Sequence, residues 1–262
     1  MTERETALQT QGVTMRFGGL TALHDFSIRV FRGDIVGLIG PNGAGKTTCF
    51  NVMTGFYRPT EGKVLFEGRD LTGMGPHQVC RAGIARTFQN IRLFANETVL
   101  QNVMIGCHVR HPLHWWEAPL HFGPVAAKER AIRDRAMALL EEVELAHLAG
   151  ECAASLPYGA QRRLEIARAL ATEPRFLLLD EPAAGMNPQE SQKLLAFIRH
   201  VRERFNVTIM LIEHDMKVVM GVCEHIWVLD YGVLIAQGTP KEIQANPRVI
   251  EAYLGEEAVA DA

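Results

Sequence analysis

The sequence predicts an α/β protein with a mostly parallel sheet. Apolar, strand-like runs at residues 176–179, 207–212 and 225–229 alternate with helical patterns, which is the order typical of parallel sheets. A glycine-rich turn joins a further apolar run at 34–39 to a helix expected at 46–54. The chain has 262 residues, of which 47% are apolar, and this is sufficient for a large buried core. Ligand sites are therefore expected at the carboxyl ends of the parallel strands.

An antiparallel β subdomain is expected near the start of the chain. Short mixed runs at 11–17 and 22–30 are separated by Gly18-Gly19, a pattern that predicts two antiparallel strands. A further strand is expected at 62–66, before a turn at Glu67-Gly68.

A helical part follows, because amphipathic patterns dominate from about residue 89 to residue 169. Its longest helix is expected at 126–144, where charged residues are interleaved among apolar ones. Helices are also expected later, at 189–204 and 216–222. The organisation predicted is one domain over 1–262, with a core at 1–89 and 165–255, a helical subdomain at 90–164 and a frayed tail at 256–262.

Charge and cysteine content exclude several classes of protein. The formal net charge is -3 and the isoelectric point is about 6.4, so there is no global basic field to hold nucleic acid. The five cysteines include no C-x-x-C pair, which favours a reducing cytosol over a disulfide-stabilised fold. No apolar run approaches the roughly 20 residues that cross a bilayer, and the first ten residues lack the layout of a secretion signal.

The most specific motif is the run GPNGAGKT at residues 40–47. It matches the phosphate-loop pattern G-x-x-x-x-G-K-[ST] and lies between an expected strand and an expected helix, as the mechanism requires. Lys46 is expected to reach the terminal phosphates and Thr47 to hold Mg²⁺. The residues predicted to bind the nucleotide here are Gly40, Pro41, Asn42, Gly43, Ala44, Gly45, Lys46, Thr47 and Thr48.

Two carboxylates end the apolar run that begins at Phe176. Taken alone, Asp180 and Glu181 are most simply the point where a core strand meets a charged loop. Beside a phosphate loop, Asp180 is placed to bind Mg²⁺ and Glu181 to polarise a water in line with the γ-phosphate. Together these motifs predict a P-loop nucleoside triphosphatase core.

The run SLPYGAQRRLEIARAL at residues 155–170 resembles the ABC-type ATPases, whose L-S-G-G-Q signature precedes a helix. The resemblance covers nearly the whole chain and implies the ABC ATPase fold, with ATP and Mg²⁺ as cofactors. It implies that Gln89 is the glutamine-loop residue, a ligand of Mg²⁺ and part of the catalytic set, that His214 is the switch histidine, and that Phe17 stacks on adenine. The signature residues, which act on the ATP of a partner chain, are Leu156, Pro157, Tyr158, Gly159, Ala160 and Gln161.

The signature departs from its commonest form at Pro157, Tyr158 and Ala160, which replace serine, glycine and glutamine. Pro157 offers neither a hydroxyl nor a backbone N–H to a γ-phosphate. The partner's ATP site, closed by this signature, is therefore expected to be less competent in hydrolysis than the site of this chain's own phosphate loop. Asn187, where many members carry aspartate, removes a charge from the expected subunit boundary.

A narrower resemblance is to the ATP-binding subunits of branched-chain amino acid uptake systems. It is carried by the Tyr158-Gly159 signature, by ARTFQN at 85–90, by EPAAGMNP at 181–188 and by the ending AYLG at 252–255. It implies a head-to-tail dimer with a second ATPase chain, expected to be a different one, with a homodimer as the alternative for the isolated chain. It also implies two integral membrane permease chains, an external solute-binding protein acting indirectly, and a peripheral place on the cytoplasmic face of the inner or plasma membrane.

Three alternative functions stay open at the level of the sequence. Urea and amide importers use closely similar ATPases, because the permeases and the binding protein select the cargo. A soluble ABC ATPase of repair or translation lacks support from any basic patch or long coiled-coil insertion. A nucleotide-binding regulator without catalysis also fits a damaged signature. His108, His111, His114 and His121 are interpreted as a solvated loop rather than a metal site, and Trp115-Trp116 as a cover of the helical part rather than a membrane anchor.

Overall fold

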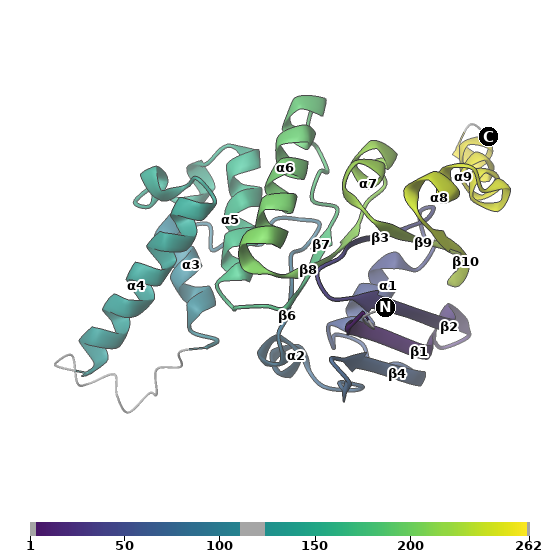
Figure 1. The fold of residues 1–262 in the computed structure, drawn as a ribbon, viewed down its shortest axis with the longest axis horizontal. Helices are drawn as coiled ribbons and strands as arrows, with labels where there is room; N and C mark the ends of the chain where they lie inside the picture. Colours follow the sequence, from purple (N-terminus) through teal and green to yellow (C-terminus); the bar gives the residue numbers. More distant parts are fainter. Residues whose placement is uncertain (1–3, 111–123, 261–262) are drawn as a thin grey trace. The chain divides into compact units, whose positions relative to one another are not determined.

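The computed structural model describes residues 4–110 and 124–260, and the chain divides into two compact units. The first contains Met1–Val79 and Arg175–Ala262, and the second contains Cys80–Pro174 (Figure 1). The expected helical segment 90–164 lies within the second unit. The boundary between Val79 of the first unit and Cys80 of the second lies within helix α2 (Pro76–Ala82).

An antiparallel sheet occupies the beginning of the first unit, in the order β2-β1-β4-β5. The predicted pair of strands is confirmed, and both strands are longer than expected. Leu8 lies opposite Val30 and Thr10 opposite Ile28 in the register of the pair. The strands are β1 (Thr6–Phe17), β2 (Leu20–Phe31), β4 (Glu61–Phe66) and β5 (Arg69–Asp70).

The predicted parallel sheet is also confirmed, with strands in the order β10-β9-β3-β8-β7 in the first unit. Every residue of β3, β7 and β8 is buried, which explains why these strands read as continuous apolar runs. Only β10 runs antiparallel, after a turn at Tyr231-Gly232 in which both residues have positive φ. The strands are β3 (Ile35–Ile39), β7 (Phe176–Asp180), β8 (Thr208–Ile212), β9 (His225–Asp230) and β10 (Val233–Gly238).

Helices of the first unit follow the ends of these strands. The helices expected at 46–54, 189–204 and 216–222 are α1 (Lys46–Met53), α6 (Pro188–Phe205) and α7 (Met216–Val222). Two more, α8 (Pro240–Gln244) and α9 (Pro247–Ala260), complete the unit.

Helix α9 continues to Ala260, so residues 256–260 of the tail expected to fray lie within a helix. The segment from Glu256 to Ala260 consists mostly of glutamate and alanine, which are among the strongest helix formers. It therefore extends the helix that begins at Pro247.

Three helices pack on one another in the second unit (Figure 1). The long helix expected at 126–144 is α4 (Pro124–Glu142), and its apolar stripe at Ile132, Ala136 and Leu140 is buried. The other elements are β6 (Ile84–Arg86), α3 (Val99–Cys107), η1 (Ala146–Leu148), η2 (Ala153–Ser155) and α5 (Tyr158–Leu170). The interpretations made above for His111, His114, His121 and Trp115-Trp116 fall outside the described residues.

Candidate functional site

The predicted phosphate loop joins β3 to α1 in the first unit. Gly40, Gly43 and Gly45 have φ values of 150°, 77° and 100°, and Gly45 is the residue before the first turn of α1. A Cβ added at Gly40 would lie 2.0 Å from the carbonyl oxygen of Leu229, and one at Gly45 would lie 2.6 Å from that of Ala22. Glycine is therefore required at both positions for the loop to curl this tightly.

The side chain of Lys46 lies within this loop. Its ammonium donates hydrogen bonds to the carbonyl oxygens of Gly40 at 2.6 Å and Pro41 at 2.8 Å, and the residue is only 8% exposed. Gly232 in the β9–β10 turn donates from its backbone N–H to the carbonyl oxygen of Ala44 at 3.0 Å. Hydrogen bonds from Lys46 and from the β9–β10 turn thus fix the conformation of the loop.

The geometry of this loop fits the nucleotide phosphates that the motif predicts as its ligand. A tight glycine cradle at a helix N-terminus, with a lysine inside it, suits a chain of phosphates. Thr47 is exposed in the first turn of α1, where its hydroxyl is available to a cation. Asp180 is the last residue of β7 and is buried, and hydroxyl and carboxylate oxygens are ligands suited to Mg²⁺.

Glu181 and His214 are brought together from two strand ends. Glu181 follows β7 with a positive φ of 44°, and its backbone N–H donates to the carbonyl oxygen of Ile212 at the end of β8, at 2.9 Å. His214 Nδ1 lies 3.5 Å from Glu181 Oε2, and the imidazole is 60% exposed while the carboxylate is 19% exposed. The parallel register of Asp180 with Ile212 produces this juxtaposition.

Glu213 is a buried carboxylate that the sequence did not single out. Its Oε1 accepts from the backbone N–H of Ala183 at 2.8 Å, and its Oε2 accepts from that of His214 at 3.3 Å. Burial raises the pKa of this carboxyl above its usual range, against the opposing effect of the amide donors and of His214. Glu213 therefore joins the turn after Glu181 to the backbone of the predicted switch histidine.

Phe17, the predicted adenine-stacking residue, is the last residue of β1 and is 42% exposed. Its ring packs edge-on against Tyr57, with a centroid distance of 5.2 Å. An exposed aromatic face next to a second ring suits stacking on a base. Tyr57 was not expected here, because it lies in the connection after α1.

Pro157 occupies the N-cap position of α5, where its carbonyl oxygen accepts from the backbone N–H groups of Ala160 and Gln161. A proline costs the helix nothing at this end. The side-chain amide of Gln161 donates back to the carbonyl oxygen of Leu156 at 2.8 Å. Asn187, which stands where many family members carry aspartate, is the N-cap of α6 and forms a capping box with Glu190.

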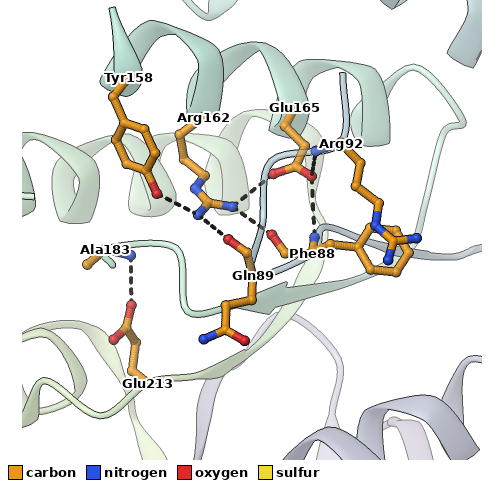
Figure 2. A network of polar contacts seen from close by, with 8 residues as sticks. All are labelled: Phe88, Gln89, Arg92, Tyr158, Arg162, Glu165, Ala183 and Glu213. Atoms are coloured by element: carbon orange, nitrogen blue, oxygen red, sulfur yellow. Dashed lines mark hydrogen bonds and ion pairs between the residues drawn. The ribbon is translucent and has the colours of Figure 1, made fainter. Parts of the chain in front are cut away.

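A polar network in the second unit surrounds Gln89 (Figure 2). Arg162 on α5 donates to the carbonyl oxygens of Phe88 and Gln89 and forms an ion pair with Glu165 at 2.9 Å. Arg162 and Glu165 have exposed fractions of 0% and 1%. The sequence shows two opposite charges three residues apart on this helix, but this spacing is equally typical of an exposed pair and does not indicate burial.

The predicted site residues thus fall into two groups. The first unit holds the phosphate loop, Asp180, Glu181 and His214 at the carboxyl ends of its parallel strands. The second unit holds Gln89 and the signature residues on and beside α5. Over residues 4–110 and 124–260, no three histidine, cysteine or acidic side chains gather as a metal site of their own. Within the same residues, every helix is too short or too polar to cross a membrane.

The chain is similar in sequence to known families and to known proteins. The family model described as ABC transporter matches residues 23–184, and the model described as branched-chain amino acid ATP-binding cassette transporter matches residues 233–259. The chain is 48% identical over 250 residues to the high-affinity branched-chain amino acid transport ATP-binding protein BraF of Pseudomonas aeruginosa, covering 95% of this chain and 98% of that protein. It is 46% identical over 249 residues to LivG of Escherichia coli K12, which has the same description, with the same coverage.

Solved structures agree with the sequence comparison. The crystal structure of the ADP conformation of MJ1267, an ATP-binding cassette of an ABC transporter, superimposes with a TM-score of 0.84 at 33% sequence identity. The match covers 96% of this chain and 99% of that chain. The same fold thus extends over nearly the full length of both chains.

Proposed function

The chain belongs to the ABC transporter family of ATP-binding cassette ATPases, and from this premise we propose that it powers the uptake of branched-chain or related hydrophobic amino acids. The proposal is supported by two relatives that carry this description and by the match of residues 233–259 to the family model for such systems. An importer of urea or amides is the second candidate, because the permeases select the cargo.

One observation carries the enzymatic part of the proposal. Glu181 and His214 meet at 3.5 Å beyond the ends of adjacent parallel strands, and the phosphate loop begins at the end of the next strand, β3. A carboxylate, a histidine and a phosphate cradle along one sheet edge suit attack of water on a terminal phosphate. A regulator that only binds nucleotide would not need the carboxylate and the histidine.

In the proposed reaction Lys46 stabilises the negative charge of the transferred phosphoryl group. Glu181 polarises the attacking water and takes its proton as the new oxygen–phosphorus bond forms and the bond to the β-phosphate oxygen breaks. His214 orients Glu181 and the γ-phosphate. Thr47, Asp180 and Gln89 are the residues that would hold Mg²⁺, and the ion would supply positive charge to stabilise the transferred phosphoryl group. Phe17 stacks on the adenine.

We further propose the assembly in which this ATPase works. Two ATPase chains, of which the second is a different one, close head to tail over two nucleotides, and closure moves two integral membrane permeases. The chain is then peripheral on the cytoplasmic face of the membrane, and an external solute-binding protein delivers the cargo. Because Pro157 has no hydroxyl, the partner's nucleotide is hydrolysed less well than the one bound by this chain's phosphate loop.

The test uses the full chain with the substitution Glu181→Gln, tagged and expressed with its chromosomal neighbours. With ATP and Mg²⁺ this variant should lose turnover and be recovered from membranes together with a second ATPase and two polytopic permeases. The solutes bound by the accompanying binding protein then separate amino acids from urea or amides. Recovery in the soluble fraction without any membrane protein would favour a soluble ATPase instead.

A separate test addresses the asymmetry between the two nucleotide sites. Pro157→Ser restores the hydroxyl of the common signature. In the assembled complex it should raise ATP turnover, and an unchanged turnover would contradict the assignment of a weaker site to this signature.

A further inference from the structure

Among the described residues of the second unit, Arg162 and Glu165 form the most deeply buried ion pair. Both side chains are shielded from solvent, with exposed fractions of 0% and 1%, and Arg162 Nη1 lies 2.9 Å from Glu165 Oε2. Burying two charges costs more than their attraction returns unless their remaining hydrogen-bonding capacity is used. A buried pair of this kind is therefore poor evidence for stability and suggests a positional role.

Four further hydrogen bonds of the pair are directed at one segment, residues 88–92. Arg162 donates to the carbonyl oxygens of Phe88 at 2.8 Å and Gln89 at 2.9 Å. Glu165 Oε1 accepts from the backbone N–H groups of Phe88 at 3.3 Å and Arg92 at 3.2 Å. All four bonds are made to backbone atoms. They therefore fix the position of the segment and do not depend on which side chains it carries.

Tyr158 is the third member of the arrangement. Arg162 Nη2, the nitrogen that donates to Gln89, also donates to the phenolic oxygen of Tyr158 at 3.2 Å. Tyr158 is the first residue of α5 and is 44% exposed, so its ring is accessible from outside the unit. The residue that stands where the common signature has glycine thus shares one guanidinium nitrogen with the backbone of Gln89 (Figure 2).

Cationic contacts add to the support of the segment. The guanidinium of Arg92 lies over the ring of Phe88 at 4.3 Å, and that of Arg86 lies over it at 5.1 Å. Contacts of this kind stabilise a ring in one orientation. The peptide that carries Gln89 is therefore held both through its backbone and through the side chain that precedes it.

We propose that Arg162 and Glu165 are positioning residues that tie Tyr158 of the signature to the backbone of Gln89. This rests on the proposed function, in which the signature contacts the partner's nucleotide and Gln89 acts at this chain's own nucleotide. A displacement of the Tyr158 ring by the partner passes through Arg162 to the carbonyl of Gln89 over two hydrogen bonds. The tyrosine in place of glycine is then a coupling element, because glycine has no side chain to make this bond.

The first experiment measures hydrogen exchange and ATP turnover of the full chain with the substitution Glu165→Gln. The amide cannot accept from two backbone donors and pair with Arg162 at the same time, so exchange at the Phe88 and Arg92 amides should rise about tenfold or more. The turnover number should fall about tenfold while the KM for ATP changes less than about twofold, because the phosphate loop belongs to the other unit. A lower melting temperature with an unchanged turnover number would mean a purely structural role and overturn the proposal.

The matched control is Arg163→Gln, which removes the neighbouring arginine of the same helix. Arg163 pairs with the mostly exposed Glu144 at 3.1 Å, and a surface pair of this kind contributes little. Its exchange and turnover should equal those of the wild type. A loss equal to that of Glu165→Gln would show that any charge change on α5 has this effect, and would overturn the proposal.

The second experiment asks whether Tyr158 acts through Gln89. Tyr158→Phe removes one oxygen from an exposed side chain, so the chain should fold normally and lose about threefold in turnover number. In a Gln89→Ala background the same substitution should have no further effect, because residues that act as one unit are not additive. A further threefold loss of turnover in that background would show that Tyr158 acts independently of Gln89, and would overturn the proposal.

The failures of the two proposals are distinguishable. A wild-type chain without ATP turnover, alone and with its partner chains, would refute the proposed function. Unchanged exchange at the Phe88 and Arg92 amides in Glu165→Gln would refute the tie whether or not ATP is hydrolysed.

Discussion

Replacing Glu213 by glutamine tests the buried carboxylate between the turn after Glu181 and the switch histidine. Wild-type Glu213 accepts from the backbone N–H groups of Ala183 at 2.8 Å and His214 at 3.3 Å, and its exposed fraction is 0%. Glutamine has one acceptor oxygen, which we expect to stay with Ala183. Its NH₂ group then faces the N–H of His214, two donors with no acceptor between them.

The expected loss of stability follows from the hydrogen bond that the substitution removes and from the buried donor that it leaves without an acceptor. A hydrogen bond to a charged group contributes about 1.5–3 kcal/mol, and an unsatisfied buried donor costs a similar amount. Part of this loss is offset, because the neutral amide does not carry the burial cost that raises the pKa of Glu213. We therefore expect the free energy of unfolding to fall by about 1–3 kcal/mol, which corresponds to roughly 2–6 °C in melting temperature for a chain of this size.

The assay is thermal unfolding of the full chain at two pH values. A raised folded-state pKa means that the wild type loses stability as the pH rises above 4.5, the ordinary value for glutamate. The variant has no such titration, so its deficit should be larger at acidic than at neutral pH. ATP turnover should also fall, because the backbone of His214 loses its anchor.

The control for this experiment is Glu203→Gln, the same change at a side chain that is 71% exposed. It should melt within about 1 °C of the wild type, since exposed ion pairs contribute little. The reasoning would be refuted if Glu213→Gln also melted like the wild type at both pH values.

Three further predictions address other parts of the first unit. Burial, partly opposed by Arg4 and reinforced by Glu224, raises the pKa of Asp34 from 3.8 to about 6; the free energy of unfolding should therefore fall by about 1–3 kcal/mol as the pH rises through this range, and Asp34→Asn should remove that slope in urea titrations. Asn187→Ala removes the capping oxygen of α6 and should lower the free energy of unfolding by about 1 kcal/mol, and an unchanged urea midpoint would contradict the capping role. Gly45→Ala places a Cβ 2.6 Å from a backbone carbonyl oxygen at a φ of 100°, so ATP binding measured by calorimetry should be lost, and retained affinity would contradict the tight cradle.

The parts of the site that could be predicted are contiguous in the sequence. The phosphate loop occupies residues 40–47, and its glycine spacing has the same consequence for the backbone in any α/β sheet. Asp180 and Glu181 were found because they end an apolar run, and the run itself marks a strand buried on both faces. Hydrophobic periodicity predicted the central strands and helices for the same local reason, but it made β1 and β2 too short.

The two buried carboxylates could not be predicted from the residues next to them in the sequence. Glu213 looked like an ordinary charge at the end of a strand, and Glu165 like one on a helix surface. Nothing in their neighbours along the chain indicates that both are buried and accept backbone hydrogen bonds.

The sequence by itself determined the fold class, the phosphate loop and the order of the motifs, because each depends on residues within about ten positions of one another. The tertiary structure decided which side chains hold those motifs in place. Glu213 reaches Ala183 across 30 residues, and Arg162 reaches Phe88 across 74. Such contacts depend on the register of strands and on the packing of helices, which bring distant backbone donors and acceptors to one buried charge.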